Sequence, residues 1–280
     1  MNGILVVDKP AGMTSHDVVD RVRKIFSTKK VGHGGTLDPD ATGVLVLAVG
    51  YATRFIDYTK DAPKRYSATA TLGASTTTQD SSGEVVESRP VDVTEDDVRA
   101  ALKRFEGDID QIPPMVSAVK IGGEALYRKA RRGEEVDRPP RRVTVHSVEL
   151  LSYDEPAAQI DVSCSGGTYI RTLIHDLGQE LGCGAHMSLL RRTASGGFSL
   201  DDAVALDDLG PQHLRPLKDA LRSLDSVTVS DEEARLVASG RRLPAKAASS
   251  GLVAVVHDEE VIAVYRRDGD ELVAEKVLGS

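Results

Sequence analysis

The sequence has only two cysteines and no long apolar run. Cys164 and Cys183 lie 19 positions apart, without a CxxC pair or a histidine at metal-ligand spacing, a pattern that fits a reducing cytoplasm. The longest apolar run, Val44 to Val49, is far shorter than the roughly 20 residues that a membrane-spanning helix needs. The first residues lack the basic segment and apolar stretch of a secretory signal. We therefore expect a soluble cytoplasmic protein with no membrane contact.

Positive charge is also scarce. Lys and Arg number 35 against 43 Asp and Glu, a net charge of -8 that argues against non-specific coating of nucleic acid. Most of the excess lies after position 200, where 16 acidic residues face 10 basic ones. Val119 to Arg142 is the exception, with eight basic and four acidic residues. Such a segment is either a solvated face or a contact for RNA phosphates.

The chain is long enough for one large domain and one small one. Apolar or alternating runs predict strands, and apolar residues at helical spacing behind Thr14 and Thr94 caps predict helices. Strands and helices mix without strict βαβ alternation, which favours an α+β fold. We expect a catalytic domain over residues 1–225 and a small module over 226–280. The predicted strands are 4–7, 44–49, 66–72, 84–87, 143–151, 159–164, 252–257 and 261–266, and the predicted helices follow Thr14, Thr94, Thr168 and Ser230.

The loop Gly32 to Gly43 carries the densest set of glycine and acidic residues. A phosphate-binding P-loop is excluded because its Lys-Ser/Thr pair is missing, and the GxGxxG spacing of a Rossmann fingerprint is missing too. A calcium loop that begins at Asp38 would have Val49 where a bidentate Glu is needed. The simplest remaining interpretation is that Asp38-Pro39 caps a turn.

Four separated blocks give the sequence a more specific interpretation. In this order and spacing they resemble the bacterial tRNA pseudouridine-55 synthases, the TruB family of pseudouridine synthases. The resemblance covers about the first 210 residues. The blocks are residues 5–15 (LVVDKPAGMTS), 31–43 (VGHGGTLDPDATG), 166–171 (GGTYIR) and 184–192 (GAHMSLLRR).

The resemblance implies a fold and a reaction. The fold would be a mixed, largely antiparallel central sheet flanked by helices and loops, with a C-terminal PUA-like module. The reaction would convert uridine 55 in the T-loop of tRNA to pseudouridine by base flipping, without a metal or an organic cofactor. Asp38 would be the catalytic carboxylate. Arg171 supports this independently, because a cation in the first turn of a helix suggests a specific anionic partner; the resemblance implies that this partner is Asp38.

Further residues take roles from the same resemblance. Tyr66 would stack on the target base and help to move the C5 proton, and Tyr169 and Leu190 would form walls of the uracil pocket. His33 would lie near the flipped nucleotide. Lys9, Asp80 and Lys120 would lie near the substrate. The basic segment Val119 to Arg142 would contact RNA.

The expected partner is the T-arm of tRNA, bound by a monomer that needs no obligate protein partner. Two other functions compete with this one. The chain could be an RNA-binding or tRNA-folding protein with little catalysis, although the presence of Asp38, Tyr66 and Arg171 together favours an enzyme. A calcium-dependent carbohydrate enzyme built on Asp38 and Asp40 is disfavoured by Val49.

Overall fold

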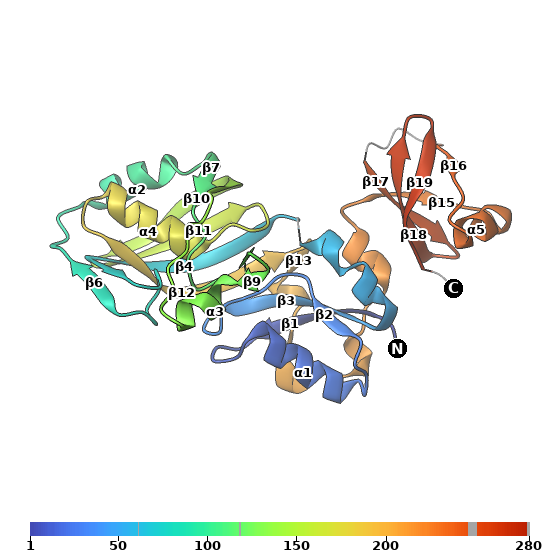
Figure 1. Ribbon diagram of the computed structural model, residues 1–280, viewed down its shortest axis with the longest axis horizontal. Coiled ribbons are helices and arrows are strands. Elements are labelled where there is room, and N and C mark those ends of the chain that lie inside the picture. Colours follow the sequence, from blue (N-terminus) through green and yellow to red (C-terminus); the bar gives the residue numbers. More distant parts are fainter. Residues whose placement is uncertain (61, 118, 246–250, 279–280) are drawn as a thin grey trace. The chain divides into compact units, whose positions relative to one another are not determined.

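The protein folds as two compact units (Figure 1). A computed structural model describes all residues except 61, 118, 246–250 and 279–280, and it leaves the side chains of residues 120 and 131 undescribed. The first unit joins Met1–Ala62 to Ala194–Ser280, and the second is Pro63–Thr193. No helix among the described residues is long and apolar enough to cross a membrane.

Two buried strands organise the first unit. β1 (Gly3–Lys9) pairs antiparallel with β3 (Thr42–Val49), in a register that sets Lys9 opposite Gly43. Both faces of this pair are covered by apolar clusters, with Ile4 and Val44 in one cluster and Leu5 and Leu45 in the other. The lack of polar alternation in both sequences follows from this double burial.

Short elements complete this part of the unit. β2 (Val31–His33) pairs antiparallel with β3, and β14 (Val204–Ala205) pairs parallel with β1. Helix α1 (Ser15–Ile25) begins with a capping box between Thr14 and Asp17 and buries Val18, Val19 and Val22. The other elements are β13 (Phe198–Ser199) and the 3-10 helices η1 (Gly50–Arg54), η2 (Ile56–Thr59), η3 (Leu200–Asp202), η4 (Leu206–Asp208), η5 (Pro211–His213) and η6 (Leu217–Leu221).

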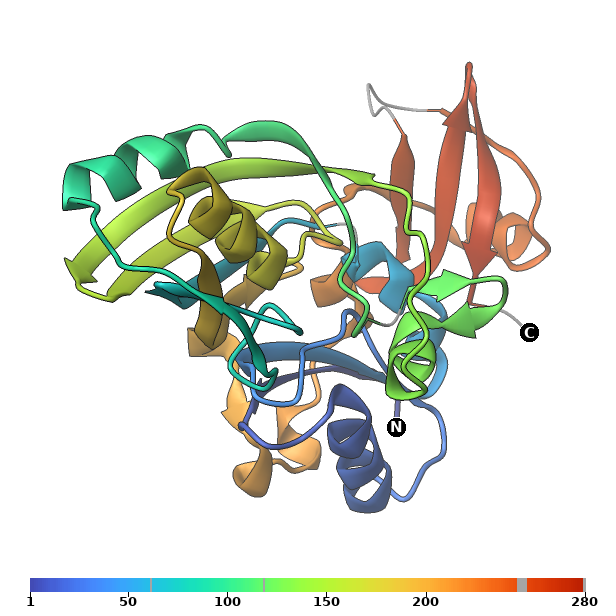
Figure 2. The same cartoon turned by 60° about the vertical axis from the view of Figure 1, so that its left-hand side comes forward.

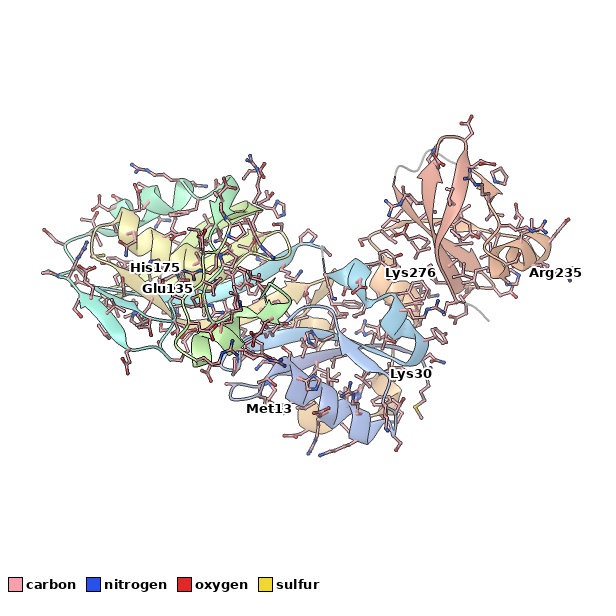
Figure 3. The ribbon with its side chains drawn as sticks, viewed as in Figure 1. Met13, Lys30, Glu135, His175, Arg235 and Lys276 are labelled. Atoms are coloured by element: carbon pink, nitrogen blue, oxygen red, sulfur yellow. The ribbon has the colours of Figure 1, made fainter. Side chains whose placement is uncertain are left out.

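The end of the chain forms a second sheet in the first unit. Its strand order is β15-β17-β18-β19-β16, and helix α5 (Asp231–Ala238) begins with a Ser230 capping box. Lys276 of β19, labelled in Figure 3, donates to the Arg54 carbonyl at 2.8 Å and so ties this sheet to η1. The strands are β15 (Asp225–Thr228), β16 (Leu243–Pro244), β17 (Leu252–His257), β18 (Glu260–Asp268) and β19 (Glu271–Val277).

The second unit is built on a largely antiparallel sheet in the order β12-β4-β11-β10-β7. Helices α2 (Glu95–Lys103) and α4 (Ile170–Glu180) lie side by side on one face of it (Figures 1 and 2). The sheet strands are β4 (Lys64–Leu72), β7 (Gly107–Gln111), β10 (Arg141–Asp154), β11 (Ala157–Cys164) and β12 (Ala185–Ser195). Two small hairpins and a helix complete the unit: β5 (Ala74–Thr76), β6 (Val85–Ser88), β8 (Lys120–Ile121), β9 (Glu124–Ala125) and α3 (Leu126–Arg131).

The predicted α+β class, with a mixed and largely antiparallel sheet, is confirmed. Details differ at element ends. The loop predicted over residues 32–43 is shorter, because its first residues form β2 against β3 and Thr42 already belongs to β3. Among the longer strands, β7, β12 and β19 were not predicted; in β19 the polar residues of Glu271–Val277 hide the pattern. The predicted division into residues 1–225 and 226–280 stays a prediction.

Candidate active site

The first unit holds Asp38 in a tightly anchored loop. Leu37, the residue before it, is buried, and Ser15 at the start of α1 binds both of its backbone groups. The Leu37 N–H donates to Ser15 Oγ at 2.8 Å, and Ser15 Oγ lies 3.1 Å from the Leu37 carbonyl oxygen. Asp38 itself is half-buried. The loop therefore presents the carboxylate from a fixed backbone.

The other side of Asp38 is anchored by Lys9. This lysine is 0% exposed, and its Nζ donates to the carbonyl oxygens of Pro10, Met13 and Pro39 at 2.8, 2.5 and 2.8 Å. The Gly12 N–H also donates to the Pro39 carbonyl at 3.0 Å. A buried ammonium group is tolerated only where hydrogen bonds replace its hydration. Lys9 thus joins the turn that carries Pro10 and Met13 to the loop that carries Asp38.

A close approach explains the glycine at position 34. A Cβ atom there would lie 2.1 Å from Thr59 Oγ1, far inside van der Waals contact. The Gly34 N–H also donates to the Val46 carbonyl at 2.9 Å, which ties the loop to β3. Gly34 is therefore required for packing of the loop.

The second unit buries Arg171 at the start of α4. The side chain is 3% exposed, and its Nη2 donates to the Val116 carbonyl at 2.6 Å. Its Nη1 lies 3.3 Å from Asp80 Oδ2, and its Cζ lies 5.9 Å from the centre of the Tyr169 ring. A buried guanidinium needs such partners, because an uncompensated buried charge is strongly destabilising.

Asp80 is held as an anion by its own turn. Its Oδ1 accepts hydrogen bonds from Thr78 Oγ1 at 2.6 Å and from Ser82 Oγ and N at 2.5 and 3.0 Å. Partial burial alone would raise the pKa of Asp80. The hydrogen bonds from Ser82 and Thr78, with the charge of Arg171, outweigh that effect and hold the pKa below its ordinary value.

The structure therefore brings three predicted site residues together in the second unit: Arg171, Asp80 and Tyr169. Thr78 and Ser82, which fix Asp80, were not identified from the sequence, since small hydroxyl residues in a Ser/Thr-rich loop give no specific signal. Asp38 belongs to the first unit. Its predicted pairing with Arg171 stays a prediction.

The other predicted residues occupy varied positions. Tyr66 lies on β4 opposite Val162 and is 6% exposed, whereas Tyr169 and Leu190 are half-buried. His33 ends β2, opposite Leu47, and is half-buried. The backbone of Lys120 forms part of β8, but its side chain lies outside the described ones. No cluster of three metal-ligating side chains occurs among the described residues.

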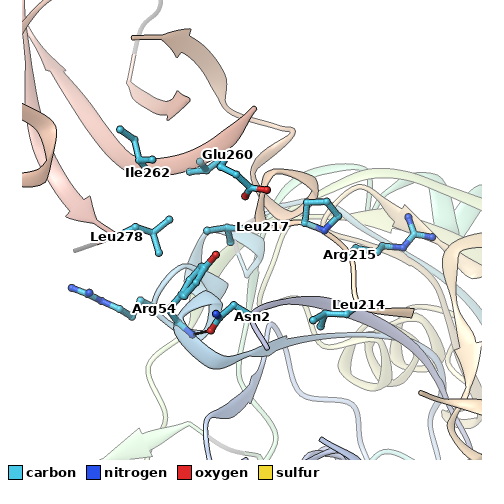
Figure 4. Close-up of a pocket in the computed structure, with 11 residues that line it drawn as sticks. Asn2, Arg54, Leu214, Arg215, Leu217, Glu260, Ile262 and Leu278 are labelled. Carbon is cyan, nitrogen blue, oxygen red and sulfur yellow. Dashed lines mark hydrogen bonds between the residues drawn. The ribbon is translucent and has the colours of Figure 1, made fainter. Parts of the chain in front are cut away.

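A pocket of about 540 Å³ lies elsewhere in the first unit (Figure 4). None of the residues predicted to carry the chemistry lines it. Its polar groups come from Asn2, Arg54, Arg215 and Glu260, and its apolar wall includes Leu217. No residue of the loop over positions 32–43 lines this pocket.

Two family models match most of the chain. Residues 23–170 match the TruB family pseudouridylate synthase (N terminal domain), and residues 171–228 match the tRNA pseudouridylate synthase B C-terminal domain. The fold and these matches define a pseudouridine synthase. The chain belongs to the TruB family of pseudouridylate synthases.

Relatives and solved structures support this membership. The chain is 47% identical to tRNA pseudouridine synthase B of Bacillus pumilus, over 87% of this chain and 84% of the relative. It is 43% identical to tRNA pseudouridine synthase B of Streptococcus agalactiae, over 99% of both. Among solved structures, a chain of a Cbf5-Nop10-Gar1 complex matches with a TM-score of 0.79 and 32% identity, over 98% of this chain and 84% of that chain.

Proposed function

We propose that this protein isomerises uridine 55 in the T-loop of tRNA to pseudouridine, with Asp38 as its catalytic carboxylate. Support for the tRNA substrate comes from the named activity of relatives that align over nearly the whole chain. The observation that carries the assignment of Asp38 is the anchoring of both its neighbours, Leu37 by Ser15 and Pro39 by Lys9. A carboxylate that must meet one atom of a substrate needs such a preorganised backbone.

The reaction sets the demands on the carboxylate. The N1–C1′ bond of uridine breaks, the uracil turns, C5 bonds to C1′, and C5 loses its proton while N1 gains one. Asp38 can attack the base or the sugar covalently, or it can stabilise the positive charge that develops at C1′. The bond re-forms within the site, so no water has to be activated and the paired carboxylates of glycosidases are unnecessary.

Arg171 is proposed to pair with Asp38 and keep it ionised. The contact to Asp80 uses Nη1, and that to the Val116 carbonyl uses Nη2, so the guanidinium is held in one orientation. Fixed in this way, it can meet a carboxylate without reorganising during the reaction. Asp80 then acts as a positioning residue for Arg171.

Tyr66, Tyr169 and Leu190 are proposed to receive the flipped base. Extruding a base from its stack costs a few kcal/mol, part of which an aromatic plane offsets. Tyr66 is proposed to stack on the uracil and to help move the C5 proton. His33 is proposed to contact the flipped nucleotide, and Lys9 and Lys120 to lie near the substrate.

The proposed activity is tested by tritium release from C5-labelled uridine in a T-arm transcript. We expect one tritium released per transcript, and none from a transcript with cytidine at position 55. If the transcript with cytidine at position 55 still released tritium, other uridines would be modified, and position 55 would not be the target. Binding of the transcript without release would favour the alternative, an RNA-binding or tRNA-folding protein with little catalysis.

Replacing Ser15 by Ala should slow the reaction without preventing binding. The variant leaves the Leu37 N–H without its acceptor in a buried place, at a cost of about 1–3 kcal/mol of folding free energy. Small misplacement of Asp38 should lower the single-turnover rate by about tenfold or more. Tritium release in single-turnover reactions quenched at successive times measures this rate.

Ser230→Ala is the matched control for Ser15→Ala. Ser230 caps α5 through the Glu233 N–H, far along the chain from the loop, and its loss should cost about 1 kcal/mol of stability. The single-turnover rate of Ser230→Ala should equal that of the wild type. An unchanged rate in Ser15→Ala, at a similar loss of stability, would refute the anchoring role.

The basic segment from Val119 to Arg142 is proposed to contact RNA phosphates, and the structure separates its cations into two kinds. Arg132 is engaged by Glu124 and Glu134, at 2.7 Å each. Arg128 is exposed and lies over the Tyr127 ring, without a carboxylate within ion-pair distance among the described residues.

Arg128→Ala should therefore weaken binding of the T-arm transcript and lower the slope of log affinity against log salt by about one unit. Arg132→Ala changes the net charge of the protein equally, but it should leave that slope nearly unchanged, because Arg132 is already neutralised. Filter binding between low and moderate salt measures both slopes. Equal slopes for the two variants would contradict a local phosphate contact.

The remaining organisation follows the same proposal. Residues 1–225 are proposed as the catalytic domain and 226–280 as a PUA-like module, whose sheet of β15 to β19 has its own apolar core. The protein is proposed to act in the cytoplasm as a monomer, without a cofactor and without an obligate protein partner.

A further inference from the structure

Gln111 is a buried polar residue that no step above uses. It is the last residue of β7, it lies opposite Arg141 of β10, and it is 2% exposed. Its side-chain amide makes two hydrogen bonds to one residue, 58 positions further along the chain. Nε2 donates to the Tyr169 carbonyl at 3.2 Å, and Oε1 accepts from the Tyr169 N–H at 3.0 Å.

Tyr169 is the N-cap residue of α4, the helix that carries Arg171. Helices α1, α2 and α5 each begin with a Thr or Ser capping box, whereas Tyr169 makes no side-chain capping bond and the first turn of α4 contains no acid. The first turn of a helix leaves backbone N–H groups without intrahelical partners. At α4, Gln111 of strand β7 holds the start of the helix instead.

The segment that follows Gln111 also binds Arg171. Five residues on, the Val116 carbonyl accepts the hydrogen bond from Arg171 Nη2 at 2.6 Å. Between them, the Pro113 carbonyl accepts a bond from Arg138 Nη1 at 3.2 Å. One segment, residues 111–116, therefore fixes both the backbone at the start of α4 and the guanidinium at the end of the Arg171 side chain.

We infer that Gln111 is a positioning residue for Arg171 in the reaction, an inference that rests on the proposed function. An amide of this length offers one donor and one acceptor side by side, which matches the N–H and C=O of a single extended residue. Without this clamp, the first turn of α4 can shift relative to β7. The guanidinium would then lose its alignment, since its Val116 and Asp80 contacts depend on the position of the helix.

Gln111→Met tests the inference, because methionine keeps the length and removes both bonds. Hydrogen exchange read by mass spectrometry should show peptides spanning residues 169–173 exchanging about tenfold faster than in the wild type. The single-turnover rate on a T-arm transcript should fall about tenfold while the dissociation constant stays within about twofold. If Gln111→Met fails to fold, Gln111→Glu keeps the acceptor for the Tyr169 N–H and should lower the rate by a smaller factor.

Tyr153→Phe is the matched control. It removes one hydrogen bond in the same unit, from the Tyr153 hydroxyl to the Val93 carbonyl at 3.2 Å, and should change neither exchange at 169–173 nor the rate. Unchanged exchange in the Gln111 variant, or faster exchange with an unchanged rate, would overturn the inference. A wild type that forms no pseudouridine would instead refute the proposed function, and the exchange measurement would still decide whether Gln111 holds α4.

Discussion

Asp38→Asn is expected to bind the T-arm transcript and to release no tritium from it. The amide keeps the shape of the side chain but is neither a nucleophile nor an anion, so the rate should fall by about 1,000-fold or more. The backbone bonds of Ser15 to Leu37 and of Lys9 to Pro39 do not involve the carboxylate, so the loop should keep its conformation. Single-turnover tritium release and filter binding measure the two effects separately.

Asp40→Asn provides the control for Asp38→Asn. Asp40 lies two residues away in the same loop, is exposed, and loses the same charge on substitution. Its rate should remain within about twofold of the wild type, because a surface charge near RNA changes affinity more than chemistry. If both variants lost a similar share of the rate and added calcium restored it, the result would support the hypothesis of a calcium-dependent enzyme. It would contradict the proposed role of Asp38.

Arg171→Lys is expected to have the second largest effect. Lysine cannot meet Asp80 and the Val116 carbonyl in the fixed fork geometry of a guanidinium, and this leaves part of a buried network unsatisfied. Losing the proposed partner of Asp38 should lower the rate by about 100-fold or more. Stability should also fall, by about 1–3 kcal/mol, as measured by urea unfolding.

Arg65→Lys makes the same substitution at an ion pair whose arginine is exposed. Arg65 Nε lies 2.7 Å from Asp161 Oδ1 on neighbouring strands of the second unit, and the arginine side chain is 59% exposed. Exposed pairs contribute little, so the variant should lose less than about 1 kcal/mol and keep its rate. If Arg171→Lys behaved like Arg65→Lys, Arg171 would have no role in the reaction.

Much of the fold could be predicted where local chemistry decides it. The apolar runs at Ile4 to Val7 and Val44 to Val49 predicted β1 and β3, because a strand buried on both faces has few polar residues. Thr14, Thr94 and Ser230 predicted helix starts that the capping boxes confirm. Where local signals are weak, as in β19, prediction failed.

The candidate site divides in the same way. Asp38 and Arg171 could be named as candidates from the sequence, since each lies in a motif with an uncommon pattern, and their roles stay predictions. The role of Lys9 in anchoring the loop could not, because lysine is normally a surface residue and its carbonyl partners become visible only in the folded chain. The Asp80 contact of Arg171 joins residues 91 positions apart, which no local pattern encodes.

The sequence by itself determined the family, strands such as β1 and β3, and the helix caps at Thr14, Thr94 and Ser230, since these depend on residue order, on apolar periodicity and on hydrogen bonds within a few residues. Only the tertiary structure decided which atoms hold the candidate site residues. Gln111 on Tyr169, Ser15 on Leu37 and Asp80 on Arg171 are contacts between distant segments. They form because buried polar groups must find partners wherever the packed chain brings them together.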